Sequence, residues 1–267
     1  MKITVFTSNQ PRHLSLIDRL AGIADEVYAV QECNTVFPGQ VSDFFRKSEV
    51  MQRYFSRVLD AEQQVFGPIH FPPSNVRQLP IKMGDLNLLP LDSFGRALES
   101  DIFIIFGATF IKGPLCQHLV SRRAINIHMG VSPFYRGSST NFWAMYDNRP
   151  QYVGATIHLL TAGLDSGPIL YHAFPPPIPT DPFIYGMQAV QSAHESLAEK
   201  LVTQELLELE PIPQDKSLEL RYTRNADFTD TAAADYLNRL PSPTELFSSL
   251  QRSDRTQFYR TTISTFG

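Results

Sequence analysis

The spacing of apolar and polar positions near the amino terminus predicts an alternation of strand and helix. Residues 2–7 (KITVFT) form a short, mostly apolar run that is typical of a buried strand. Residues 14–24 place leucine and isoleucine at helical spacing, and residues 25–32 predict a second strand. This β-α-β beginning with short connections is typical of a doubly wound parallel sheet.

The pattern continues through the middle of the chain with less regularity. We expect a long helix over 41–66, a proline-rich loop with one short strand over 67–91, a helix over 91–100, a fully buried strand over 101–107 and a helix over 114–120. The aromatic and methionine side chains of the first of these helices predict a packing surface rather than a ligand site.

The second half of the chain predicts a short strand, a short helix, two strands joined by a turn, and a long helix. Their expected ranges are 124–128, 141–147, 153–160, 168–174 and 181–208. Beyond these, an irregular arm is followed by two short helices. We therefore expect a catalytic α/β domain over 1–205 and a small, mainly helical C-terminal extension over 206–267.

Charge and apolar length narrow the class of protein. The formal net charge of -4 does not favour a nucleic-acid surface, which is normally basic. No apolar run approaches the ~20 residues of a membrane span, so we expect a soluble, cytoplasmic protein. The two cysteines are far apart and lack metal-ligand spacing, so neither a disulfide nor a metal site is implied.

The candidate chemistry lies between residues 124 and 167. Asn126 and His128 are two residues apart on the short apolar strand, so both side chains project from one face. Burying such a pair without partners is costly. Asp165 lies in the glycine-containing turn between the next two strands, and that turn could bring its carboxylate to the pair.

An amide, an imidazole and a carboxylate are suited to acyl transfer. The first two can donate to an oxygen that gains negative charge, and one such donor typically contributes ~3–4 kcal/mol. The carboxylate can orient the histidine or move a proton. A purely structural arrangement, in which Asn126 and His128 satisfy buried backbone groups and Asp165 forms a turn, explains the same residues. The residues alone leave both interpretations open.

At these positions the sequence resembles the formyltransferases that use N10-formyltetrahydrofolate. That family has Asn-x-His at a strand end and an Asp in a D-[ST/A]-G turn a few dozen residues later. The matching positions here are Asn126, His128, Asp165-Ser166-Gly167, Pro133, Arg136-Gly137, Gly154-Ala155-Thr156 and Gly107. The resemblance covers roughly residues 1–205, is most specific over 124–170, and implies a Rossmann-like α/β fold.

The resemblance also implies roles for individual residues. Asn126 and His128 would polarise the formyl oxygen, and Asp165 would assist proton transfer from the attacking amine. The folate would be bound by Gly107, Ala108, Thr109, Phe110, Ile111, Leu160, Thr161, Ala162, Gly163 and Leu164. Met129, Gly130 and Arg136 would lie on the acceptor side. His158, in the strand before the turn, is expected to have a structural hydrogen-bonding role.

Departures from the family pattern bear on the acceptor. Met129-Gly130 stands where Pro-Ser is common, the first turn lacks the usual motifs of the tRNA and purine enzymes, and the tail is short for a tRNA-binding barrel. We therefore expect a nucleotide-linked amino sugar as acceptor, with the tail supplying acceptor contacts or a homodimer surface. Another small amine, methionyl-tRNA and glycinamide ribonucleotide are alternatives. A formyltetrahydrofolate hydrolase and a non-catalytic folate-binding protein also stay open.

Overall fold

The computed structural model describes residues 1–35 and 48–264. Its main feature is a sheet with strand order β10-β8-β7-β5-β4-β1-β2-β3, beside a small β6-β9 pair. The strands are β1 (Lys2–Thr7), β2 (Glu26–Cys33), β3 (Val76–Lys82), β4 (Ile102–Phe106), β5 (Ile125–Met129), β6 (Tyr135–Gly137), β7 (Ala155–Leu159), β8 (Ile169–Phe174), β9 (Arg221–Thr223) and β10 (Thr262–Ile263).

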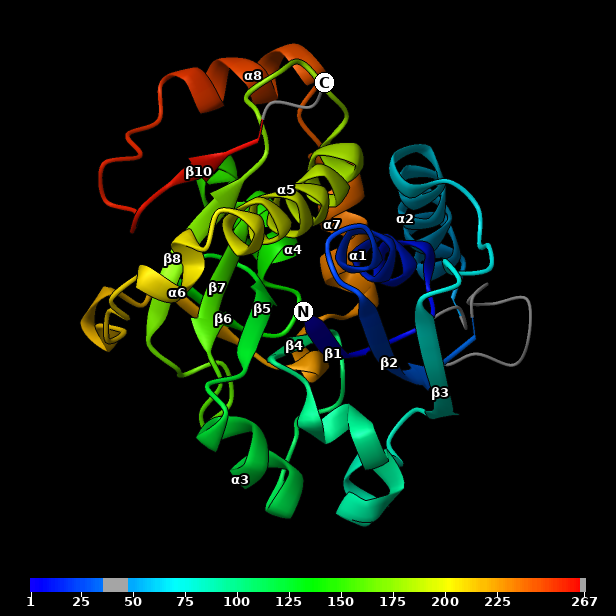
Figure 1. The fold of residues 1–267 in the computed structure, drawn as a ribbon. Coiled ribbons are helices and arrows are strands. Elements are labelled where there is room, and N and C mark those ends of the chain that lie inside the picture. Colours follow the sequence, from blue (N-terminus) through cyan, green and yellow to red (C-terminus); the bar gives the residue numbers. More distant parts are fainter. Residues whose placement is uncertain (36–47, 265–267) are drawn as a thin grey trace.

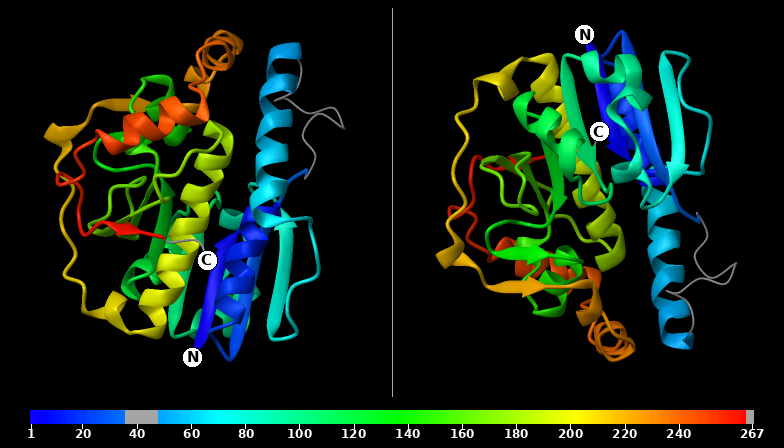
Figure 2. Two further views of the ribbon diagram at one scale, coloured as in Figure 1. Left: turned by 90° about the horizontal axis from the view of Figure 1, so that it is seen from above. Right: turned by 90° about the horizontal axis from the view of Figure 1, so that it is seen from below.

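Helices cover both faces of this sheet (Figures 1 and 2). They are α1 (Pro11–Ala21), α2 (Glu49–Phe66), α3 (Gly113–Ser121), α4 (Thr140–Tyr146), α5 (Pro182–Val202), α6 (Glu205–Glu208), α7 (Asp230–Asn238) and α8 (Pro243–Gln251). Short 3-10 helices occupy Leu86–Leu88, Leu91–Glu99, Pro150–Tyr152, Lys216–Leu218 and Asn225–Asp227. Helices α1, α2 and α5 lie on one face, and α3 with the 3-10 segment Leu91–Glu99 lies on the other.

Strand direction confirms the predicted α/β class. Strands β1 to β5 are parallel to one another, β7 runs antiparallel to β5, and β8 runs antiparallel to β7. The sheet is therefore mostly parallel, with β7 as the reversed strand, and the predicted hairpin is the β7–β8 pair. The buried apolar residues of β1, β4 and β5 explain the position of the core, because parallel strands covered on both faces are apolar throughout.

Three predicted helices differ from the structure. The predicted helix over 41–66 begins at Glu49, where the Ser48 side chain caps it, and its predicted part over 41–47 lies outside the described residues. The segment over 91–99 is a 3-10 helix and not an α-helix, because the φ of Gly95 is 47° and interrupts helical geometry. The predicted helix over 181–208 is divided into α5 and α6 because Gln204 adopts a φ of 62°.

The chain beyond residue 205 adds to the sheet layer. Strand β9 pairs in parallel with β6, strand β10 pairs in parallel with β8, and Ile212 forms a bridge with Ile169. Leu246 and Phe258 pack in one hydrophobic cluster with Trp143. The boundary at 205 between a catalytic domain and an extension stays a prediction. Within the described ranges, no helix has both the length and the apolar character needed to cross a membrane.

Candidate functional site

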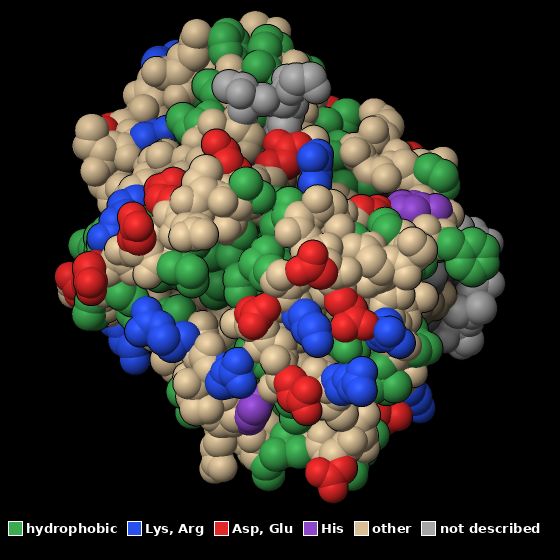
Figure 3. Space-filling view, viewed as in Figure 1, with side chains coloured by type: hydrophobic (Ala, Val, Ile, Leu, Met, Phe, Trp, Pro, Cys, Tyr) green, Lys and Arg blue, Asp and Glu red, His purple; other side chains and the backbone are tan. Residues whose placement is uncertain are grey.

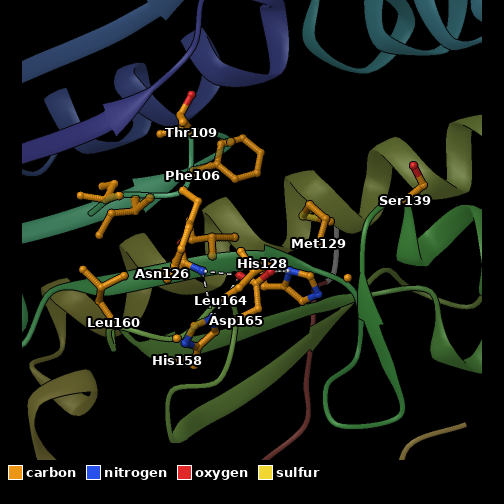
Figure 4. A pocket seen from close by; sticks show the side chains of 18 residues that line it. Phe106, Thr109, Asn126, His128, Met129, Ser139, His158, Leu160, Leu164 and Asp165 are labelled. Atoms are coloured by element: carbon orange, nitrogen blue, oxygen red, sulfur yellow. Dashed lines mark hydrogen bonds and ion pairs between the residues drawn. The ribbon is translucent and has the colours of Figure 1, made fainter. Parts of the chain in front are cut away.

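The candidate site forms where β5 lies between β4 and β7. In the antiparallel β5–β7 register, Asn126 is opposite His158, and His128 is opposite Thr156. Because side chains alternate along a strand, Asn126, His128 and His158 project from one face of the sheet. The turn after β7 then returns Asp165 to the same face. Figure 4 shows the four side chains converging on one cavity.

The distances define a connected polar cluster. The Asn126 amide nitrogen donates to Asp165 Oδ1 at 3.1 Å and to His158 Nε2 at 2.9 Å. His128 Nδ1 lies 3.3 Å from Asp165 Oδ2. His128 is 8% exposed, and its Nε2 atom is buried and unpaired. The structure thus brings together the three side chains that the sequence singled out, and leaves one buried imidazole nitrogen unpaired.

Electrostatics keep the Asp165 carboxyl group ionised. Burial on its own raises the pKa of Asp165, but the nearby charge and hydrogen bonding of His128, together with His158, outweigh burial and hold that pKa well below its usual range. An ionised carboxylate beside Nδ1 favours a proton on that nitrogen. Asp165 can therefore orient the His128 ring and stabilise positive charge on it.

His158 contacts the polar cluster directly, which the sequence did not indicate. Its Nδ1 donates to the main-chain oxygen of Leu159 at 2.8 Å, which leaves Nε2 without a proton in the neutral ring. Nε2 accepts from Asn126, so the amide nitrogen must point into the cluster. The predicted hydrogen-bonding residue therefore fixes the orientation of Asn126. The antiparallel pairing with Asn126 is the signal that could have revealed this contact, because opposite residues in a ladder share a face.

The polar cluster borders a cavity of about 280 Å³. Eight of the ten positions expected to hold the folate line this cavity: Gly107, Ala108, Thr109, Phe110, Ile111, Leu160, Gly163 and Leu164. Thr161 and Ala162 are outside the lining. Met129, Gly137 and Ser139 also line it, whereas Gly130 and Arg136 do not. Apolar side chains thus form much of the lining, and the polar cluster forms one end of it, which suits a flat ring that carries a reactive polar group.

Arg136 and Gly130, which were expected on the acceptor side, lie close to other parts of the protein. The Arg136 guanidinium is paired with Glu219 at 2.8 Å, so its charge is already matched within the protein. Gly130 has a φ of 146°, and a Cβ placed there would lie 2.1 Å from Thr140 Oγ1. Gly130 thus allows a close backbone approach rather than offering a contact group.

A buried carboxylate fixes the wall of the cavity at 107–111. Glu32, at the end of β2, is fully buried, and its two oxygens accept from the main-chain nitrogens of Gly84 at 2.9 Å and Thr109 at 2.6 Å. Gly107 has a φ of 65°, and a Cβ there would lie 2.4 Å from the His13 ring. The family resemblance indicated residues 107–111 but not Glu32, which contacts Thr109 across 77 positions of sequence.

The described residues contain no group of three or more His, Cys, Asp or Glu side chains placed to hold a metal ion. The functional groups at the cavity are therefore an amide, two imidazoles and a carboxylate. Comparison with known proteins relates this set to a family.

A family model described as formyl transferase matches residues 91–201, which include the whole polar cluster. Over this segment the chain is similar to the formyl transferase family. The resemblance inferred from Asn126, His128 and the Asp165 turn is thereby confirmed for this segment. A methionyl-tRNA formyltransferase of Synechococcus sp. (strain JA-3-3Ab) is 34% identical over 126 residues, which are 46% of this chain and 38% of that protein. The chain thus spans well under half the length of such formyltransferase relatives.

Solved formyltransferase structures share the fold. A 4-N formyltransferase from Francisella tularensis has a TM-score of 0.53 at 19% identity, covering 88% of this chain and 86% of the other. A phosphoribosylglycinamide formyltransferase from Anaplasma phagocytophilum has a TM-score of 0.50 at 16% identity, covering 84% and 99%. At these identities the likeness concerns the fold alone.

Proposed function

We propose that this protein transfers a formyl group from N10-formyltetrahydrofolate to a primary amine. The observation that carries this proposal is the grouping of His128, Asn126 and Asp165 in the lining of one cavity, with His128 Nε2 buried and unpaired. A buried ring nitrogen without a partner costs free energy unless a ligand atom completes its hydrogen bonding. An oxygen of the formyl group is the proposed partner.

In the proposed reaction the donor supplies the formyl group, and the residues of the protein control charge and protons. As the amine adds to the formyl carbon, electrons move onto the formyl oxygen. A protonated His128 Nε2 donates to that oxygen, and one preorganised donor of this kind contributes ~3–4 kcal/mol. Asp165 stabilises the charged ring through Nδ1 and, through a water molecule, takes the proton that the amine loses. As the electrons return from the oxygen, the bond between the formyl carbon and N10 of the donor breaks. The proton passes to N10, so that tetrahydrofolate leaves and the formamide remains.

The part of the cavity formed by residues 107–111 is the proposed folate site. It fits a flat heteroaromatic ring because its lining is mainly apolar and its main chain is fixed by the Glu32 contact with Thr109. Leu160, Gly163 and Leu164 form the opposite wall. In Figure 4, Thr109 and Leu160 lie on different sides of the polar cluster. Since His128 lines the same cavity, this arrangement supports a formyl group bound beside His128.

For the acceptor we propose a nucleotide-linked amino sugar first and methionyl-tRNA second. The first choice is supported by the formal net charge of -4 and by the mixed acidic and basic side chains on the face in Figure 3, neither of which favours a large polyanion. The second is supported by the names of sequence relatives such as the Synechococcus enzyme. A cytoplasmic location is part of the same proposal.

The test is an incubation of the purified protein with N10-formyltetrahydrofolate and a panel of amines. The panel contains nucleotide-linked amino sugars, simple amines, glycinamide ribonucleotide and charged methionyl-tRNA, and mass spectrometry detects the gain of one formyl group. We expect formylation of one class and no folate product without an amine. Steady release of formate without an amine would instead identify a hydrolase. Binding of the folate with no product on any amine would identify a folate-binding protein.

A further inference from the structure

The turn that carries Asp165 is held from outside by a residue far away in sequence. The Gln214 side-chain amide donates to the main-chain oxygen of Asp165 at 2.9 Å and to that of Gly167 at 2.8 Å. A single amide group thus bridges the two carbonyls on either side of Ser166. Gln214 lies beyond the segment that matches the formyl transferase family model, so the family resemblance does not account for it.

The backbone of Gln214 is itself anchored. Ile212 and Ile169 exchange two main-chain hydrogen bonds, at 2.7 and 2.8 Å, so the strand-like segment before Gln214 lies against the start of β8. This pairing delivers the Gln214 side chain to the turn that precedes β8. The contact is therefore fixed at both ends, on Ile212 and on the carbonyls of the turn.

Asp165 needs such support because of its backbone conformation. Its φ of 43° lies in the left-handed region, which is uncommon for residues other than glycine, Asp being among those that adopt it more often. Within the turn, the Thr161 and Ser166 hydroxyl groups are 3.0 Å apart and share a hydrogen bond. That bond closes the turn on itself but does not attach it to the rest of the protein, whereas the Gln214 amide does.

We propose that Gln214 is a positioning residue for Asp165, holding the turn so that the carboxylate meets both His128 and Asn126. The proposal rests on the proposed formyl transfer for its catalytic consequence. Its structural part stands independently on the two hydrogen bonds. The C-terminal segment then has a defined role in the site, because Gln214 holds the Asp165 turn and lies outside residues 91–201.

The main test is Gln214→Met, which keeps the length of the side chain and removes both donors. Because a displacement of catalytic groups by about 1 Å can cost as much as a hundredfold, we expect kcat to fall between about tenfold and a hundredfold. The KM values for donor and amine should change by less than about twofold, since the cavity lining is untouched. Gln214→Asn, which keeps the amide on a shorter side chain, should recover part of the lost kcat.

The matched control is Gln257→Met, because the Gln257 amide also donates to a turn carbonyl, that of Asp254, in the same C-terminal segment. Gln257→Met should retain wild-type kcat and KM. Equal effects of the two substitutions would overturn the positioning role. So would a Gln214→Met enzyme whose KM rises while its kcat is unchanged, or a Gln214→Asn enzyme that is no better than Gln214→Met.

Amide hydrogen exchange of the 163–167 turn provides a readout that needs no activity. Exchange there should be faster in Gln214→Met than in the wild type and in Gln257→Met, while exchange in β4 and β5 stays unchanged. If the wild-type protein formylates no amine, the proposed function fails and this exchange alone decides whether Gln214 holds the turn. If exchange in the turn is the same in Gln214→Met as in the wild type, Gln214 does not hold the turn, whatever the activity of the variant. Faster exchange throughout the chain would refute the positioning role too, because the effect would be global.

Discussion

Acid should weaken this fold through a histidine that joins the sheet to the C-terminal segment. His172 in β8 is fully buried; its Nε2 donates to the main-chain oxygen of Ser132 at 2.8 Å, and its Nδ1 accepts from the main-chain nitrogen of Tyr259 at 3.1 Å. Burial is the main cause that lowers the pKa of His172 to about 4. A second proton would also place a donor against the Tyr259 N–H group.

The direction and size of this loss of folding stability follow from the shift in the pKa of His172. The pKa of His172 is lower in the folded state, about 4, than in the unfolded state, about 6.5, so folding favours the neutral ring. Its stabilising contribution is complete above pH 6.5 and is lost as the pH falls from 6.5 towards 4. At about 1.4 kcal/mol per pH unit, the loss from His172 alone amounts to about 2 kcal/mol at pH 5.

The assay is urea unfolding of the wild type and of His172→Gln at pH 7.5 and pH 5. The variant should be less stable at pH 7.5, because Gln cannot reproduce both hydrogen bonds, but it should lose about 2 kcal/mol less than the wild type on acidification. His70→Gln is the control, since an exposed His70 pairs with Asp18 and the Pro68 carbonyl and its pKa is raised. Equal acid losses in wild type and His172→Gln would refute the reasoning.

Three further predictions concern the site. Asn126→Ala, His128→Ala and Asp165→Ala should each lower kcat by roughly 10²–10⁴-fold with the fold intact by circular dichroism, and near-normal turnover in any of them would contradict the mechanism. The rate of the wild type should rise with pH between 5 and 8, because only the unprotonated amine can attack the formyl carbon, and a flat profile over that range would count against transfer to an amine. Glu32→Gln should raise the KM for the folate donor severalfold with a smaller effect on kcat, because an amide N–H would face the N–H of Gly84 or Thr109. Initial rates at increasing donor concentration measure this KM. An unchanged KM would show that Glu32 does not shape the folate site.

Local pattern was sufficient to predict the elements that position the site. The apolar run around Asn126 and His128 predicted β5 and the shared face of the two side chains, and the glycines around Asp165 predicted the turn between β7 and β8. These features depend on residues within a few positions of one another. Strand periodicity and turn composition therefore carry the information.

Pairings between distant segments could not be predicted in the same way. Strand β6 pairs with β9 across more than 80 residues, and Gln214 reaches the Asp165 turn across 49. A three-residue strand is too short to have a recognisable periodicity of apolar residues, and a single glutamine has none. The sequence therefore contains no pattern that would predict either contact. Gly95 is a different case, since its φ of 47° interrupts a segment whose apolar spacing is helical. There the local signal for a helix was present and backbone geometry overrode it.

The distribution of hydrogen bonds assigns different tasks to the two donors in the site. The Asn126 amide has two N–H groups, and in this structure both are used, one by His158 Nε2 and one by Asp165 Oδ1. His128 Nε2 is buried and unpaired. In the proposed reaction, an incoming formyl oxygen would therefore pair with His128 without breaking any bond, whereas Asn126 would first have to release Asp165 or His158. Release of Asp165 would free its Oδ1 atom to take up the proton that the amine loses, and the two steps of the proposed reaction would then be linked through one amide.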